Sequence, residues 1–164
     1  MKKNQIKNLI TDSDLNSQWV YEVLEWADKY NVTDVMQICN THNYQTYEEA
    51  LISLQCINAS GKGIEYLPNS IGKLIHLESV NISKNLLSSI PSSIGNLFNL
   101  HTLDLSSNHI EKLPPDIAKL LSLKSLNISW NHMNQLPSFL SSMDGLEKLD
   151  TSWNRVKNTN RKLI

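Results

Sequence analysis

The sequence predicts an α/β solenoid, a right-handed coil with a parallel sheet on its concave side and helical or 3₁₀ segments on its convex side, preceded by an α-helical cap. The prediction rests on residues that recur every 23 positions, as expected of a repeat architecture. Prolines recur at Pro68, Pro91, Pro114 and Pro137. Asparagines recur at Asn85, Asn108, Asn131 and Asn154. Leucines begin successive units at Leu54, Leu77, Leu100, Leu123 and Leu146.

Composition limits the classes of protein to consider. The 164 residues, 40% of them hydrophobic, suffice for one domain with a continuous core. A net charge of -1 gives no global field toward nucleic acid or an anionic membrane. The sequence has neither a signal-peptide-like start nor an apolar run approaching the roughly 18 residues that span a bilayer. With only Cys39 and Cys56 as cysteines, we expect a cytoplasmic protein, or one translocated into a host cell without a classical signal peptide.

Residues 1–50 form the predicted helical cap. Apolar residues three or four apart predict an amphipathic helix over Ser17–Lys29, which Asn31 is expected to end. These apolar residues are Trp19, Val23, Ala27 and Tyr30. A second helix is expected over Thr33–Cys39, and Thr46 with Glu49 has the form of a capping box before the repeats begin. Because the first unit of a solenoid exposes its core unless it is covered, we expect removal of residues 1–45 to cause aggregation.

Residues 51–157 form about five predicted repeats, and residues 158–164 form a short C-terminal tail. Alternating apolar residues in each repeat predict a short strand with one face inward, paired in parallel with its neighbours. The recurrent asparagine ends the strand, where its amide can satisfy buried backbone groups, so a stacked asparagine ladder is expected. Apolar residues three apart then predict a helical or 3₁₀ turn on the convex side. They are Ile71, Ile94, Ile117 and Leu140, followed by Leu74, Leu97, Leu120 and Met143.

The repeat unit reads LxxLxLxxNxLxxLPxxIxxL, as in Leu100-His-Thr-Leu-Asp-Leu-Ser-Ser-Asn108 and Leu113-Pro-Pro-Asp-Ile-Ala-Lys-Leu120. In this pattern the chain resembles the leucine-rich-repeat family over about residues 51–157, with the 23-residue LPxxIGxLxxLxxLxLSxN type of unit. Its helical lead-in over residues 24–32 resembles that of small bacterial members. The resemblance implies the solenoid and a role in recognising proteins through the curved sheet.

No motif in the sequence indicates an enzyme or a cofactor. It lacks a glycine-rich phosphate loop, metal-spaced cysteines, an HExxH helix and a GxSxG elbow. His109 and His132 stand one repeat apart, which places them roughly 5 Å from each other. Two ligands with no acidic residue or cysteine in their column make a poor metal site, so no metal is expected. The recurrent serines before each ladder asparagine are attributed to the repeat and not to catalysis.

The candidate partner-binding residues gather toward the C-terminal repeats of the concave face. They are Trp130, Trp153, His109, His132, Arg155, Asp104, Asn127 and Asp150. Exposed tryptophans are enriched, together with arginine, at the energetic centres of protein interfaces. A second interpretation is that Trp130 and Trp153 stack on each other and cover the edge of the core, a contact worth about 1 kcal/mol. The sequence leaves both interpretations open.

We therefore expect a non-catalytic module that binds a protein partner on its concave face, with neither nucleic acid nor membrane as a partner. Bacterial proteins with this repeat include effectors that act on host proteins, so an effector role is one expectation. The alternatives are the recognition portion of a ubiquitin-ligase-type effector that lacks its catalytic domain, and a self-associating scaffold. An uncovered last strand would also support a weak homodimer through the C-terminal edge.

Overall fold

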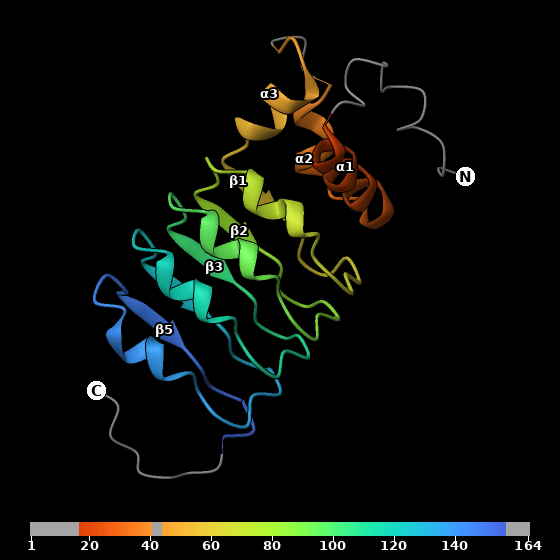
Figure 1. The fold of residues 1–164 in the computed structure, drawn as a ribbon. Coiled ribbons are helices and arrows are strands. Elements are labelled where there is room, and N and C mark those ends of the chain that lie inside the picture. Colours follow the sequence, from red (N-terminus) through yellow and green to blue (C-terminus); the bar gives the residue numbers. More distant parts are fainter. Residues whose placement is uncertain (1–16, 41–43, 157–164) are drawn as a thin grey trace.

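The computed structural model describes residues 17–40 and 44–156, in which three cap helices precede a solenoid of stacked repeats (Figure 1). The cap helices are α1 (Gln18–Tyr30), α2 (Thr33–Ile38) and α3 (Tyr47–Ile52). Each repeat contributes one strand to a parallel sheet in sequence order, namely β1 (Cys56–Asn58), β2 (Ser79–Asn81), β3 (Thr102–Asp104), β4 (Ser125–Asn127) and β5 (Lys148–Asp150). The opposite side carries the 3₁₀ helices η3 (Asn69–Lys73), η4 (Ser92–Asn96), η5 (Pro115–Lys119) and η6 (Ser138–Ser142). The predicted solenoid and helical cap are confirmed.

The cap helices begin and end close to the predicted residues. Asn31 ends α1 in the left-handed conformation, with φ 53°. At the start of α3, the Thr46 hydroxyl oxygen accepts the N–H of Glu49 at 3.1 Å. The Glu49 carboxylate accepts the N–H of Gln45 at 3.0 Å, one residue earlier than a standard capping box. Helix α3 continues to Ile52, past the predicted boundary between residues 50 and 51, and its Leu51 is buried in the common core.

The parts of the prediction at the chain ends fall on residues that are not described. Residues 1–16 of the predicted cap and the predicted tail, 158–164, lie outside the described ranges, as does residue 157 at the end of the predicted repeats. Within the described residues, no helix is long and apolar enough to cross a bilayer.

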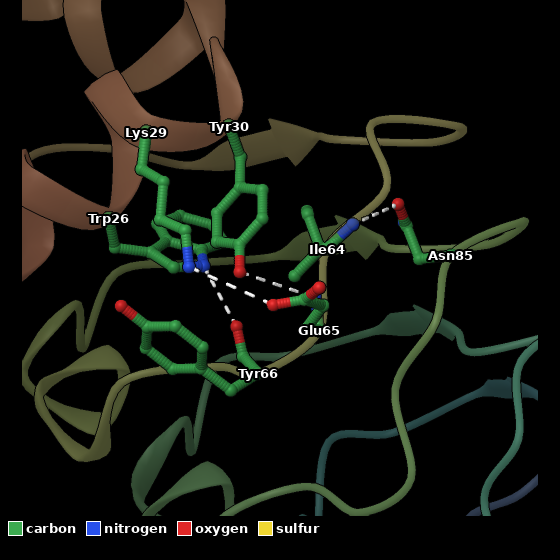
Figure 2. Close-up of polar contacts among 7 residues, drawn as sticks. All are labelled: Trp26, Lys29, Tyr30, Ile64, Glu65, Tyr66 and Asn85. Carbon is green, nitrogen blue, oxygen red and sulfur yellow. Dashed lines mark hydrogen bonds and ion pairs between the residues drawn. The ribbon is translucent and has the colours of Figure 1, made fainter. Parts of the chain in front are cut away.

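Helix α1 joins the cap to the first repeat through Trp26, which is 1% exposed (Figure 2). Its indole Nε1 donates to the backbone carbonyl of Tyr66 at 3.0 Å. Beside it, the Lys29 ammonium lies 4.7 Å from the ring centroid of Tyr30 and 4.9 Å from that of Tyr66. The hydrogen bond with Tyr30 raises the pKa of Lys29 against a smaller opposing effect of desolvation, and electrostatic interactions with Tyr30, Tyr66 and then Glu65, at 3.9 Å, raise it further. The prediction placed Trp19 on the inner face, but Trp26 occupies the centre of this contact and Trp19 is only partly buried.

The cap also closes the free edge of the sheet. In β1 the N–H of Asn58 points away from β2, since the backbone bonds to β2 come from its neighbours. The carboxylate of Asp34 in α2 accepts that N–H at 2.6 Å. An unpaired strand edge is a template for association with other chains, so this contact protects the N-terminal end of the solenoid.

The asparagine ladder is formed as predicted. Asn85, Asn108 and Asn131 are buried, and the amide of each donates to carbonyls of its own repeat and of the repeat before it. Its oxygen accepts an N–H from that preceding repeat, as Asn85 does from Ile64 at 3.0 Å (Figure 2). Asn154 continues the ladder in the last repeat, where it is half-buried. The ladder therefore satisfies backbone groups that the turn of each repeat buries.

Glycine allows close packing on the 3₁₀ side. A Cβ on Gly72 would lie 2.3 Å from the carbonyl oxygen of Ser93, and one on Gly95 would lie 2.4 Å from that of Asp116. The equivalent residue in the next repeat is Ala118, and there η5 and η6 touch less extensively than the earlier 3₁₀ helices do. The close approach at Gly72 and Gly95 thus requires a residue without a Cβ.

The C-terminal repeat is the least buried one. Leu149 in β5 is 43% exposed, whereas the equivalent residues of the other four strands are fully buried. Thr151 also stands where the earlier repeats place a buried apolar residue, namely Ala59, Ile82, Leu105 and Ile128. Among the described residues nothing covers this last layer as the cap covers the first.

Candidate protein-binding site

The turn after each strand holds a residue in the left-handed conformation at the same position of the repeat. These residues are Gly61, Lys84, Ser107, Trp130 and Trp153, with φ between 54° and 67°. These residues make the same backbone hydrogen bond to the next repeat. The N–H of Ser107 donates to the carbonyl oxygen of Ser129, and the N–H of Trp130 donates to that of Ser152, both at 2.9 Å. L-residues with a side chain are uncommon in this region, and bulky ones are rare. We call these five residues the turn column.

The turn column displays two stacked tryptophans. The rings of Trp130 and Trp153 have centroids 4.5 Å apart and an interplanar angle of 14°. They remain 54% and 69% exposed, respectively. The rings therefore pack on each other and still present a large aromatic surface, and the binding of a partner by this surface stays a prediction.

A second pair of rings, tilted by 31°, is formed two residues further along each repeat. The rings of His109 and His132 have centroids 4.9 Å apart, close to the separation predicted from the repeat. Arg155 continues this column in the last repeat. Partial desolvation lowers the pKa of His132, and the positive charge of Arg155 and then His109 lowers it further. We call Trp130, Trp153, His109, His132 and Arg155 together the aromatic rim.

The other three predicted partner-binding residues end their strands, side by side in register. Asp104, Asn127 and Asp150 are paired across β3, β4 and β5. Each side-chain Oδ1 accepts the N–H of the serine two residues later, at 2.9 to 3.1 Å. The hydroxyl and N–H of that serine lower the pKa of Asp150. One oxygen of each side chain thus stabilises the turn, and the arrangement that recurs in each repeat is an Asx-turn.

The sequence reasoning missed three further exposed apolar residues, which precede the starts of the strands and so lie away from the turns that follow them. Ile75, Phe98 and Leu121 occupy equivalent positions just before their strands, and all three are exposed. The signal was present, since an apolar residue directly follows the buried leucine of the convex side in three successive repeats. It was also missed that Tyr66 lines a pocket of about 340 Å³ with Glu22 and Glu25 of α1.

The cysteines do not contribute to the aromatic rim. Cys39 is half-buried in the cap, and burial raises the pKa of its thiol to about 11. Cys56 is an exposed free thiol in β1. In the described residues, no three histidine, cysteine or acidic side chains are grouped so that they could hold a metal ion.

The repeats identify the family. A family profile described as a leucine-rich repeat region matches residues 60–163, more than half of the chain. The chain therefore belongs to the leucine-rich-repeat family. No curated protein matches the chain significantly.

Solved structures support the same fold. A leucine-rich-repeat protein of Leptospira interrogans is similar with 25% identity and a TM-score of 0.65, over 70% of this chain and 29% of its own length. An internalin of Listeria monocytogenes is similar with 22% identity and a TM-score of 0.61, over 68% of this chain and 32% of its own. A chain of the BIR3–SERK2 complex of Arabidopsis thaliana shares 33% identity, with a TM-score of 0.56, over 62% of this chain and 57% of its own. The chain thus spans about a third of the two bacterial proteins.

Proposed function

We propose that this protein is a non-catalytic module that binds a protein partner through the aromatic rim at the C-terminal half of its sheet. The observation that carries the proposal is the exposure of the stacked Trp130 and Trp153, at 54% and 69%. The leucine-rich-repeat fold implies a role in protein interaction, and one similar structure is itself a complex between two proteins.

Backbone conformation supports the same assignment. A side-chain-bearing residue in the left-handed region costs roughly 1 to 2 kcal/mol relative to glycine, and Gly61 shows that glycine fits this turn. Stacking of two aromatic rings returns about 0.5 to 1.5 kcal/mol for the pair. The stack therefore offsets at most part of the conformational cost of two tryptophans. A gain in binding supplies a reason for both residues to be present.

Affinity capture with matched variants tests the proposal. The double variant Trp130→Ala, Trp153→Ala is compared with wild type and with Phe98→Ala, Leu121→Ala, which removes exposed apolar side chains that precede the strands. We expect partners captured from bacterial or host-cell lysate by wild type to be lost with the first variant and retained with the second. Circular dichroism verifies that both variants are folded. Retention by the tryptophan variant would show that the aromatic rim is not the binding site.

The source of the captured partner addresses the finer proposals. A host protein supports an effector that acts on host proteins from the cytoplasm after translocation, and a bacterial protein supports a role inside the producing cell. Capture of a charged ubiquitin-conjugating enzyme would favour the recognition portion of a ligase-type effector.

Self-association is a second candidate function, favoured by the exposure of Leu149 in the edge strand β5. It predicts a mass that rises with protein concentration in light scattering. Leu149→Lys should abolish that rise, whereas the Trp130→Ala, Trp153→Ala double variant should not change it.

A further inference from the structure

Ser107 of the turn column lies next to the stacked tryptophans but carries no ring. The column runs Lys84, Ser107, Trp130 and Trp153 over four successive repeats, with nearly equal φ of 54° to 57°. Equal backbone conformation in hydrogen-bonded register directs the four side chains along parallel paths. Trp130 and Trp153 show that one repeat advances the column by 4.5 Å, which is a ring-stacking distance. Ser107 is too short to cover the remaining face of Trp130.

The open place over Ser107 has a defined boundary on each side. One side is the indole of Trp130, which is 54% exposed although Trp153 covers its other face. The other side is the exposed Lys84, one repeat beyond Ser107. A planar group above Ser107 would lie about 4.5 Å from each, taking one repeat as the step. These separations suit aromatic stacking on Trp130 and a cation–π contact with Lys84.

Charge favours an aromatic ring over a guanidinium group at this place. Lys84 borders it directly, and Arg155 adds positive charge within the same rim. The nearest acidic residue in the sequence is Asp104, whose Oδ1 already accepts the N–H of Ser106. The cap shows that this chain combines lysine with aromatic rings, since the Lys29 ammonium lies under 5 Å from two tyrosine ring centroids.

We propose that the place over Ser107, between Trp130 and Lys84, is a binding slot for one aromatic side chain of the partner protein. The inference rests on the proposed function, because the slot is part of the surface assigned to the partner. It adds the chemistry of the anchor residue, a tyrosine, phenylalanine or tryptophan ring held between an indole and an ammonium group.

A random-peptide phage library selected against the full chain tests the slot. We expect the selected peptides to share an aromatic residue whose replacement by alanine weakens binding about tenfold in fluorescence polarisation. Ser107→Trp fills the slot with the protein's own ring, in a backbone conformation that Trp130 already adopts, and should weaken binding at least tenfold. Lys84→Ala, at an exposed position, should weaken it roughly 2- to 5-fold. Phe98→Ala is the matched control and should change nothing.

The outcomes separate the slot from the proposed function. Peptides that are lost with Trp130→Ala but still bind both Ser107→Trp and Lys84→Ala would overturn the slot and leave the aromatic rim as the binding surface. A consensus of arginine without an aromatic residue would overturn the aromatic anchor. Peptides that bind the Trp130→Ala variant as tightly as wild type would count against both proposals, and so would failure to select any peptide. If circular dichroism shows that Ser107→Trp is unfolded, the test of the slot relies on the loss of binding in Lys84→Ala and on the aromatic residue shared by the selected peptides.

Discussion

The asparagine ladder makes a quantitative prediction at Asn108, which is 3% exposed. Its Oδ1 accepts the N–H of Leu87 at 3.0 Å, and its Nδ2 donates to the carbonyls of Ile82 and Leu105, each at 3.0 Å. Those two carbonyls are each bonded by a second ladder amide as well, from Asn85 and from Asn131. Asn108→Ala therefore removes the acceptor of one buried N–H but leaves each carbonyl one donor.

The expected loss follows from this count. A buried N–H without its acceptor costs about 1 to 3 kcal/mol. The small cavity left by the amide adds about 1 kcal/mol. We expect Asn108→Ala to lower the free energy of unfolding by about 3 kcal/mol, measured by urea denaturation followed by circular dichroism.

Asn154→Ala provides the matched control. Asn154 makes the same contacts, accepting the N–H of Met133 at 3.1 Å and donating to Ile128 at 2.9 Å, but it is only half-buried. Water can replace a partner there, so we expect a loss of about 1 kcal/mol. Equal losses in the two variants, or a loss below about 1 kcal/mol for Asn108→Ala, would refute the reasoning that burial makes the ladder stabilising.

Three further predictions concern the cap, the aromatic rim and the thiols. Trp26→Phe keeps most of the buried ring but leaves the Tyr66 carbonyl without its indole donor, so thermal denaturation should show a loss of about 1 to 2 kcal/mol, against about 3 to 5 kcal/mol for Trp26→Ala. The pKa of His132 is lowered from 6.5 in the folded state, so the unfolded chain binds more protons. The contribution of His132 to stability is complete above pH 6.5 and should decline as the pH falls below that value. Tm should therefore decrease with decreasing pH in this range, and His132→Asn should make the decrease smaller. At pH 8 Cys56 should react rapidly with a thiol reagent, whereas Cys39, with a pKa of about 11, should stay largely unmodified until the protein unfolds; equal rates would contradict this.

The fold could be predicted because each recurrent residue meets the same environment once per repeat. Asn108 and its equivalents predicted both the turn and the ladder, since a buried backbone turn needs an amide at a fixed place. The docking of the cap could not be predicted in the same way. Periodicity predicted that α1 has an inner face, but burial of Trp26 depends on Tyr66, 40 residues away. The contact of Asp34 with the edge of β1 likewise spans 24 residues and leaves no local signal.

The candidate site was predicted as a set of columns but not in its conformation. The spacing of the repeats predicted that His109 and His132 lie about 5 Å apart, and it left open whether Trp130 stacks on Trp153. It did not predict the left-handed turn at Trp130, because only Gly61 in that column is a residue typical of positive φ. The Asx-turn at Asp104 was visible as an Asp or Asn two residues before a serine, yet it was interpreted only as a binding position.

In this chain the side chains of the turn column are separate from those that hold the repeats together. The ladder asparagine is fixed because its amide completes buried hydrogen bonds in two repeats at once. The left-handed residue next to it makes its recurrent turn contact through the backbone, as the N–H groups of Lys84 and Trp130 both do at 2.9 Å. Its side chain is therefore unconstrained by the core, and glycine, lysine, serine and tryptophan all occur there. The rings of Trp130 and Trp153, in adjacent repeats, have centroids 4.5 Å apart and stack. A small residue in the neighbouring repeat, such as Ser107, leaves room for one more ring beside them. The order of side chains along this column thus defines the surface presented to a partner.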